Sequence, residues 1–287
     1  MATSAAKRYV IGVSLKMYFS HARTVQWCRA VARFAREHPA ITGGVAELFV
    51  VPDYLAIPAA LEIFGDRVAV GAQDLSTDDG GALTGEVSGA TLAELGCTVV
   101  EVGHAERRRF FGDTDAVVRA KVAAAFRHGL TPVLCVGEAA PGDPADAAAE
   151  CIRQLDDALG GVRIVDGSCR LIVAYEPVWA IGAAAPATAE HIGTVCRALR
   201  AHLHTRPGNE QPGSTQPAVI YGGSASPGLV TALADRIDGI FLGRFAHDPA
   251  ALGTILDEVL ALTPAAPAAA PAAPPSQPAD NICIPEV

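Results

Sequence analysis

The chain has 287 residues and a formal net charge of −9 at pH 7. The acidic balance, without a basic stripe, argues against nucleic acid as a partner. No apolar run approaches the ~18 residues that a membrane span needs, and residues 1–8 lack the apolar segment of a signal peptide. We therefore expect no membrane association, and expect any phosphate to be bound locally, by backbone N–H groups and one or two cations.

Composition also bounds the domain organisation. The seven cysteines are unclustered and odd in number, which disfavours a disulfide framework and a zinc site and favours a reduced cytoplasm. From Thr263 onward the chain is almost pure Ala and Pro, which predicts a disordered tail over 263–287. Residues 1–262 remain, close to the ~250 residues of one (β/α)₈ barrel.

Short β-branched apolar runs alternate eight times with longer stretches of helical period. The predicted strands, in chain order, are Tyr9–Ser14, Glu47–Val51, Val68–Gln73, Thr98–Val102, Pro132–Val136, Leu171–Tyr175, Ala218–Tyr221 and Gly239–Leu242. Strands that are apolar throughout are buried on both faces, as in a parallel sheet covered by helices. The pattern predicts an α/β protein with a single (β/α)₈ TIM barrel. An open doubly wound sheet is the alternative, but no G-x-G-x-x-G follows the first strand.

A barrel places its chemistry at the carboxyl ends of its strands. The polar and glycine residues that directly follow predicted strands are Lys16, His104, Glu106, Glu176, Gly222-Gly223-Ser224 and Gly243-Arg244. Because these residues gather at one rim, the sequence predicts a site there.

Each of these residues also has a structural interpretation. Lys16 is either a point charge for an oxyanion or a solvated lysine, and Glu106 could neutralise it across the barrel mouth. His104, beside a glycine, is as a lone residue more often a structural hydrogen-bonding group. Glu176 precedes a Pro-opened run of small residues that suits a mobile lid, although an acidic helix cap is the alternative. The Gly-Gly-Ser turn before Ala225 could cradle an anion or be a plain turn.

Taken together, these segments resemble the triosephosphate isomerase family. The matching segments are Leu15–Met17, Gly71–Asp74, Leu83–Ser88, Gly103–Arg108, Cys135–Glu138, Ala174–Gly182 and Tyr221–Ser224. Their order and spacing match the family along about 250 residues, and A-Y-E-P-V-W-A-I-G is highly specific. The resemblance implies a TIM barrel and an aldose–ketose isomerase that needs neither metal nor organic cofactor.

Residue roles follow from the resemblance alone. Glu176 would be the base, His104 the neutral electrophile, and Lys16 a source of positive charge. The backbone N–H groups of Gly182, Ser224 and Gly243 would bind the phosphate of a small sugar phosphate. In this family the loop after the third strand inserts into a second subunit, which implies a homodimer with that loop near 75–85.

The chain departs from the family pattern around the substrate. Ser14 stands where Asn is usual and Ala105 where Ser is usual, which leaves more room in the pocket. Residues 183–185 are all Ala where the lid usually carries Thr-Gly-Lys. Arg244 replaces a glycine near the phosphate, and either adds a charge there or points outward. Similar changes occur in paralogues that act on four-carbon sugars such as erythrulose phosphate.

Four functions remain open from the sequence. The first is interconversion of dihydroxyacetone phosphate and glyceraldehyde 3-phosphate, and the second is the same proton transfer on a tetrulose phosphate. A Schiff-base aldolase using Lys16 is a third, which the presence of Glu176 in its lid context opposes. The fourth is a non-catalytic sugar-phosphate sensor, which the altered lid keeps open.

Overall fold

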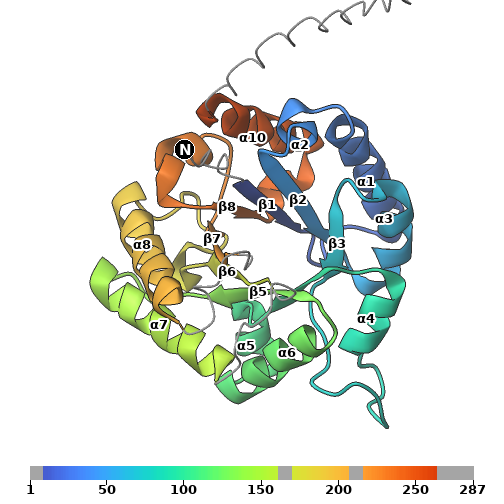
Figure 1. Cartoon of the computed structure of the whole chain (residues 1–287), viewed down its shortest axis with the longest axis horizontal. Helices are drawn as coiled ribbons and strands as arrows, with labels where there is room; N and C mark the ends of the chain where they lie inside the picture. The colour runs from blue at the N-terminus through green and yellow to red at the C-terminus, as the bar shows by residue number, and fades with distance from the viewer. Residues whose placement is uncertain (1–8, 161–169, 207–215, 264–287) are drawn as a thin grey trace, which may run out of the picture.

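Eight parallel strands close into a barrel in the order of the sequence, β1 to β8, in a computed structural model that describes residues 9–160, 170–206 and 216–263 (Figure 1). The strands are β1 Tyr9–Ser14, β2 Ala46–Val51, β3 Ala69–Ala72, β4 Val99–Val102, β5 Thr131–Val136, β6 Ile172–Tyr175, β7 Ala218–Tyr221 and β8 Gly239–Leu242. β1 pairs with both β2 and β8, so no sheet edge remains.

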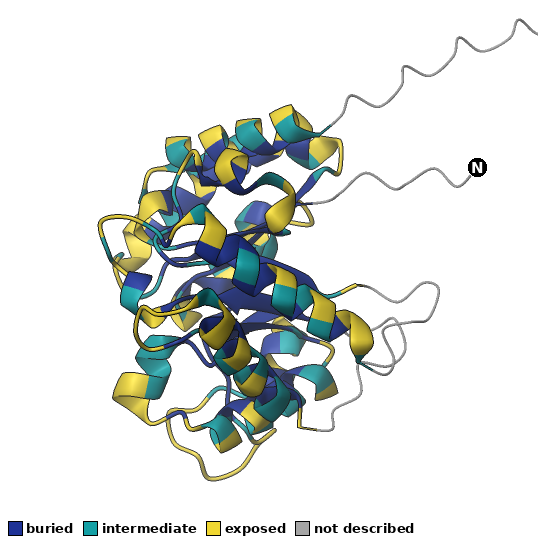
Figure 2. Cartoon of the chain, turned by 90° about the vertical axis from the view of Figure 1, so that its left-hand side faces the viewer, coloured by how far each residue is buried: buried dark blue, intermediate teal, exposed yellow. Residues whose placement is uncertain are grey.

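Helices surround the barrel (Figure 1). The α-helices of the described residues are α1 His21–Ala35, α2 Pro39–Thr42, α3 Ile57–Phe64, α4 Gly89–Leu95, α5 Ala105–Phe111, α6 Asp115–Arg127, α7 Pro144–Leu159, α8 Ala189–Thr205, α9 Leu229–Leu233 and α10 Pro249–Leu262. Their buried faces turn toward the strands and their exposed faces toward solvent (Figure 2). The apolar contact between strands and helices forms the larger of two hydrophobic clusters.

The smaller cluster fills the barrel interior. It includes Val10, Phe49 and Phe241, whose two phenyl rings lie 5.6 Å apart between centroids. Because side chains alternate along a strand, residues of one parity face this interior and those of the other parity face the helices. The same alternation decides which side chains reach the site at the carboxyl ends of the strands.

The predicted barrel is confirmed, and each predicted strand overlaps an observed one within two residues at either end. The arginine run at 107–109 lies in α5, where Arg107 pairs with Asp74 and Asp113 and Arg108 pairs with Asp115. These ion pairs fix Arg107 and Arg108 in a salt-bridged helix beside the site.

The predicted domain boundary lies at the end of α10. Beyond Thr263 the proposed tail lies outside the described residues, so its disorder stays a prediction. Within the described ranges, no helix is both long and apolar enough to cross a bilayer.

The barrel interior predicts a stability effect at Gly12. A Cβ at this position would lie 2.2 Å from Cζ of Phe49 and 2.7 Å from Cδ2 of Phe241, so Gly12→Ala forces both rings to move. We expect a loss of about 1–3 kcal/mol in the free energy of unfolding, measured by urea denaturation. Gly253→Ala, in α10 with open space around it, is the control and should stabilise by roughly 0.5–1 kcal/mol. Equal effects of the two substitutions would contradict this packing account.

Candidate active site

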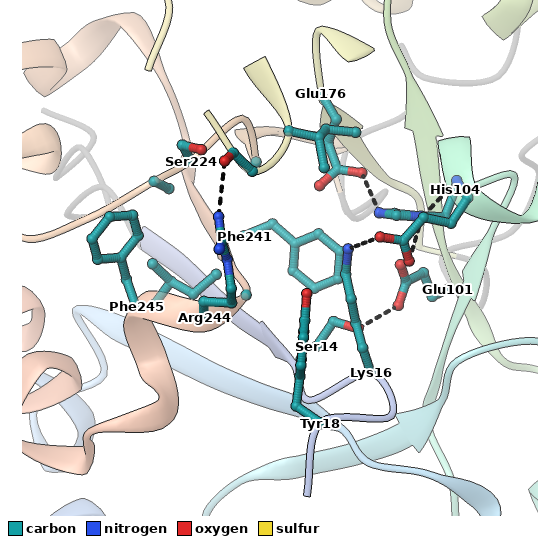
Figure 3. Close-up of a pocket in the computed structure, with 17 residues that line it drawn as sticks. Ser14, Lys16, Tyr18, Glu101, His104, Glu176, Ser224, Phe241, Arg244 and Phe245 are labelled. Atoms are coloured by element: carbon teal, nitrogen blue, oxygen red, sulfur yellow. Dashed lines mark hydrogen bonds and ion pairs between the residues drawn. The ribbon is translucent and has the colours of Figure 1, made fainter. Parts of the chain in front are cut away.

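One cavity of about 270 Å³ opens at the carboxyl ends of the strands. All nine residues that the sequence predicted for the site line it: Ser14, Lys16, His104, Glu106, Glu176, Gly182, Ser224, Gly243 and Arg244. They come from the ends of β1, β4, β6, β7 and β8 (Figure 3). The geometry therefore brings the predicted groups together around one space, while their individual roles remain proposals.

His104 and Glu176 face each other across this cavity. The distance from Nε2 of His104 to Oε2 of Glu176 is 3.5 Å, and both residues are buried. Nδ1 of His104 accepts a hydrogen bond of 3.1 Å from the backbone N–H of Glu106, in the first turn of α5. An imidazole nitrogen that accepts a hydrogen bond carries no proton, so this contact assigns the ring proton of a neutral His104 to Nε2, which points into the cavity.

Glu176 is held close to the turn that follows β7. A Cβ on Gly222 would lie 2.3 Å from Oε1 of Glu176, so only glycine leaves room for this carboxylate. Oε2 of Glu176 is buried and has no hydrogen-bond partner among the described residues. A buried carboxylate oxygen without a partner is costly, and such groups concentrate at functional sites.

Lys16 adopts a backbone conformation that is uncommon for a residue with a side chain. Its φ of 47° lies in the left-handed region, and Nε2 of Gln73 donates a 3.0 Å hydrogen bond to its carbonyl oxygen. Nζ of Lys16 donates to Oε1 of Glu106 at 2.7 Å. Burial acts to lower the pKa of Lys16, but the hydrogen bond to Glu106 and the charge of Glu176 outweigh burial and raise it. The ammonium group therefore stays charged, and Glu106 supports it as the sequence suggested.

The segment after β6 begins with a firm anchor. Trp179, in the 3₁₀ turn Val178–Ala180, donates from Nε1 to Oε1 of Glu138 at 2.8 Å. The hydroxyl of Tyr175 and Nε2 of His191 bind the same carboxylate. One buried glutamate thus fixes the start of the predicted lid to β6 and α8.

The rest of the lid lies against the turns after β7 and β8. Oγ of Ser224 donates to the carbonyl oxygens of Ala180 and Ala183, at 2.8 and 3.0 Å, and the N–H of Ala187 donates to the hydroxyl of Tyr221 at 3.0 Å. Nη2 of Arg244 donates to the carbonyl oxygen of Gly182 at 2.9 Å (Figure 3). Arg244 therefore faces the cavity and the lid.

Glu101 is the ionisable carboxyl group of this cavity that sequence reasoning missed. Its side chain projects into the barrel from β4, three residues before His104, and is 3% exposed. Oε2 accepts a 2.9 Å hydrogen bond from Oγ of Ser14. Burial raises the pKa of Glu101 to about 7, the nearby Glu176 also raises it, and His104 and Lys16 lower it. The signal was available as a lone carboxylate in the middle of a strand that otherwise reads as buried and apolar.

The raised pKa of Glu101 predicts a stability effect of known sign. In the unfolded chain this carboxyl ionises near pH 4.5, but in the folded protein only near pH 7. Between these values the folded state binds more protons, so its stability falls as pH rises. From pH 5 to pH 8 the free energy of unfolding of the wild type should fall by roughly 2–3 kcal/mol relative to Glu101→Gln. Parallel pH profiles of the two proteins would contradict this assignment.

Comparisons with known proteins agree with this geometry. The chain is 48% identical to a protein of Pectobacterium atrosepticum named L-erythrulose-1-phosphate isomerase, over 91% of this chain and 100% of that protein. It is 36% identical to a triosephosphate isomerase of Synechococcus, over 89% and 98% of the two chains. A crystal structure of triosephosphate isomerase from Bartonella henselae superposes with a TM-score of 0.71 at 29% identity, over 88% and 98%.

The family model described as triosephosphate isomerase matches residues 9–259, which is almost the whole of the described barrel. With His104 and Glu176 in one cavity at the strand ends, and this match over the barrel, the chain belongs to the triosephosphate isomerase family.

Proposed function

We infer that the chain is an isomerase that moves a proton between adjacent carbons of a small phosphorylated ketose, with L-erythrulose 1-phosphate as its preferred substrate. The observation that carries the chemistry is the buried Oε2 of Glu176, which has no hydrogen-bond partner in the described part of the chain and lies opposite Nε2 of His104. A carboxylate and an N–H group on one cavity suit a carbon acid and the carbonyl oxygen beside it. Membership of an isomerase family supports the same reaction class.

The chemistry follows from these groups. A C–H bond next to a carbonyl is a weak acid, so its base must be positioned and shielded from bulk water, as Glu176 is. The enediolate that forms needs donors already aimed at its oxygens, and Nε2 of His104 and the ammonium of Lys16 provide them. The division of labour between a Glu base and a neutral His is the one established for triosephosphate isomerase.

The phosphate group suits the opposite side of the cavity. Gly182, Ser224 and Gly243 line this side, and Arg244 adds a guanidinium to it (Figure 3). Backbone N–H groups at glycine turns form cradles for anions, and a guanidinium adds charge-assisted hydrogen bonds to phosphate. Arg244 replaces the close backbone approach of the usual glycine by a side-chain contact. A phosphate at this rim would direct the carbon chain toward Glu176 and His104.

Substrate preference rests on the pocket and on one relative. Ser14, which lines the cavity, is shorter than the Asn usual in the family, and this supports a longer carbon chain. Ala105 does not line this cavity but a smaller pocket beside Arg108, so the room expected from it lies elsewhere. The Pectobacterium protein, which is named L-erythrulose-1-phosphate isomerase, matches this chain along the whole length of that protein. On L-erythrulose 1-phosphate, a proton passes from the third carbon to the second and the hydroxyl proton of the third carbon passes to the oxygen on the second, so the carbonyl moves to the third carbon. The product is a second ketose phosphate, whereas on a triose phosphate the same step interconverts a ketose and an aldose.

A direct assay tests this function. The wild-type protein is given L-erythrulose 1-phosphate and, separately, dihydroxyacetone phosphate, and the kcat/KM for each is measured. We expect the tetrulose to be favoured by at least about tenfold, because one added carbon with a hydroxyl group is commonly worth this much in a fitted pocket. A preference for the triose would support the proposed reaction but show that the proposed substrate is wrong. No turnover of either sugar would contradict the isomerase and favour a sugar-phosphate sensor.

We also propose a homodimer. The segment between β3 and α4 projects from the barrel (Figure 1), and Leu83 within it is 44% exposed. Met17, next to Lys16, is 92% exposed. Apolar side chains presented in this way suit burial against a second copy, close to the site. The sequence also predicts that the protein needs neither a metal nor an organic cofactor and that it lies in the cytoplasm. These remain predictions.

Sedimentation velocity tests the dimer. The wild type should have a sedimentation mass of twice the chain mass of 29.5 kDa. The double variant Leu83→Asp, Met17→Asp should shift toward the monomer, because two carboxylates are costly to bury in an interface. Leu95→Asp, an exposed leucine at the end of α4, is the control. A wild type that remains monomeric at micromolar concentration would overturn the proposal.

A further inference from the structure

Glu101 is a buried acid that the proton transfer described above does not use. Its one hydrogen bond among the described residues comes from Ser14, and the one lysine of the cavity, Lys16, pairs with Glu106 instead. Removing a carboxyl group from water is expensive unless hydrogen bonds or an opposite charge compensate for it. One hydroxyl donor is a small compensation for a residue that is 3% exposed. A buried carboxyl group that lines a cavity and is under-satisfied is a candidate for ligand binding.

The position of Glu101 along the barrel says what it could bind. On β4 it precedes His104 by three residues, and on β1 its partner Ser14 precedes Lys16 by two. The pair therefore lies deeper in the barrel than the proposed proton-transfer groups. Ser224 and Arg244 lie across the cavity from Glu101 (Figure 3). The proposed phosphate rim and Glu101 therefore lie on opposite sides of the cavity, and Glu101 lies deeper in the barrel than His104.

A four-carbon substrate has its extra atoms at the corresponding end. L-erythrulose 1-phosphate differs from dihydroxyacetone phosphate by a hydroxymethyl group on the carbon that loses its proton. With the phosphate at the rim and that carbon at Glu176, this group is the end of the molecule farthest from the phosphate. It carries one hydroxyl, which can donate a hydrogen bond to the carboxyl group of Glu101 while Ser14 keeps its own hydrogen bond to that group.

We propose that Glu101, held by Ser14, binds the terminal hydroxyl of a four-carbon ketose phosphate and so sets the preference for tetrulose over triose. This inference rests on the proposed function, because it names the group that reads that substrate. With a triose the carboxyl group has no hydroxymethyl partner, so the smaller substrate leaves it under-satisfied. A pocket that hydrogen-bonds a substrate hydroxyl discriminates strongly against an analogue without it, because its own polar group is then left unpaired.

The protonation equilibrium of Glu101 supports the same role. Because burial raises the pKa of Glu101 to about 7, the group is partly protonated near neutral pH. The protonated form adds little negative charge beside Glu176, and either form accepts a hydrogen bond from a hydroxyl group. Glu101 can therefore serve as a hydrogen-bonding group without strong repulsion of the proposed base.

The test compares three substrates in the wild type and in Glu101→Leu. The substrates are L-erythrulose 1-phosphate, its 4-deoxy analogue and dihydroxyacetone phosphate, and kcat/KM is measured for each. In the wild type, removal of the terminal hydroxyl should cost roughly 10–100-fold, the range for a hydrogen bond to a carboxyl group. In Glu101→Leu the natural tetrulose and its deoxy analogue should become nearly equal. Glu101→Gln, which keeps an acceptor and gains a donor, should retain part of the discrimination.

Each result bears on one of the two claims. If the wild type does not turn over the tetrulose, the proposed substrate is wrong and this inference falls with it. If the wild type turns it over but Glu101→Leu keeps the full discrimination against the deoxy analogue, another group binds the hydroxyl and this inference alone is overturned. A loss in Glu101→Leu by the same factor on all three substrates would show a general effect on the site, and would also overturn it.

Thermal unfolding of each variant controls for folding. If Glu101→Leu does not fold, Ser14→Ala takes its place, because it removes the hydrogen bond that holds Glu101. We expect it to lower the ratio of tetrulose to deoxy-tetrulose kcat/KM by roughly 2–10-fold, the range for one neutral hydrogen bond. An unchanged ratio in that variant would overturn the role of the pair.

Discussion

The approach of His104 to Glu176 is the interaction on which the rest of the site depends. The two side chains follow the ends of β4 and β6, which do not pair with each other, and only closure of the barrel turns both strand ends toward one cavity. Several features serve this approach. The N–H of Glu106 fixes the proton of His104 on Nε2, and Gly222 leaves room for the carboxylate of Glu176. The geometry is costly, since it buries a carboxylate oxygen that has no hydrogen-bond partner within residues 9–160, 170–206 and 216–263.

Around that approach, the structure separates functions by depth. The rim of β7 and β8 and the lid provide glycine turns and Arg244, which suit an anion. The floor provides Glu101 and Ser14, which suit a hydroxyl group. A linear sugar phosphate with a charged end and a hydroxyl end fits this order in only one direction. The catalytic groups between them then meet the carbons that exchange a proton.

The sequence predicted the barrel well, for physical reasons that apply strand by strand. Runs such as residues 171–175 are apolar throughout, so they can only be buried on both faces, and the eightfold alternation leaves few other architectures. The rim residues were predictable too, because each follows a strand directly. His104 and Glu176 could be placed at one rim from the sequence, but their distance could not, since it depends on barrel closure.

Glu101 escaped prediction for a related reason. A run that is apolar except for one residue is predicted as a buried strand. Its one polar residue is then easily taken for an exposed position at the edge of the sheet. Only the register of β4 shows that residue 101 shares the interior parity with Val99, and only the closed barrel brings it to Ser14. The contact of Arg244 with the lid was likewise beyond reach, because the sequence left its direction open.

The most direct test of the account is solvent isotope exchange with Glu176→Gln. In D₂O the wild type should convert its sugar phosphate into product that carries deuterium at the carbon that receives the proton, because an enediolate formed by a side-chain base exchanges with solvent. Glu176→Gln should lose both turnover and exchange by about 10³-fold while sugar-phosphate binding persists, and Glu94→Gln, outside the cavity, should lose neither. Near-normal turnover in Glu176→Gln, or product without deuterium from the wild type, would contradict the account.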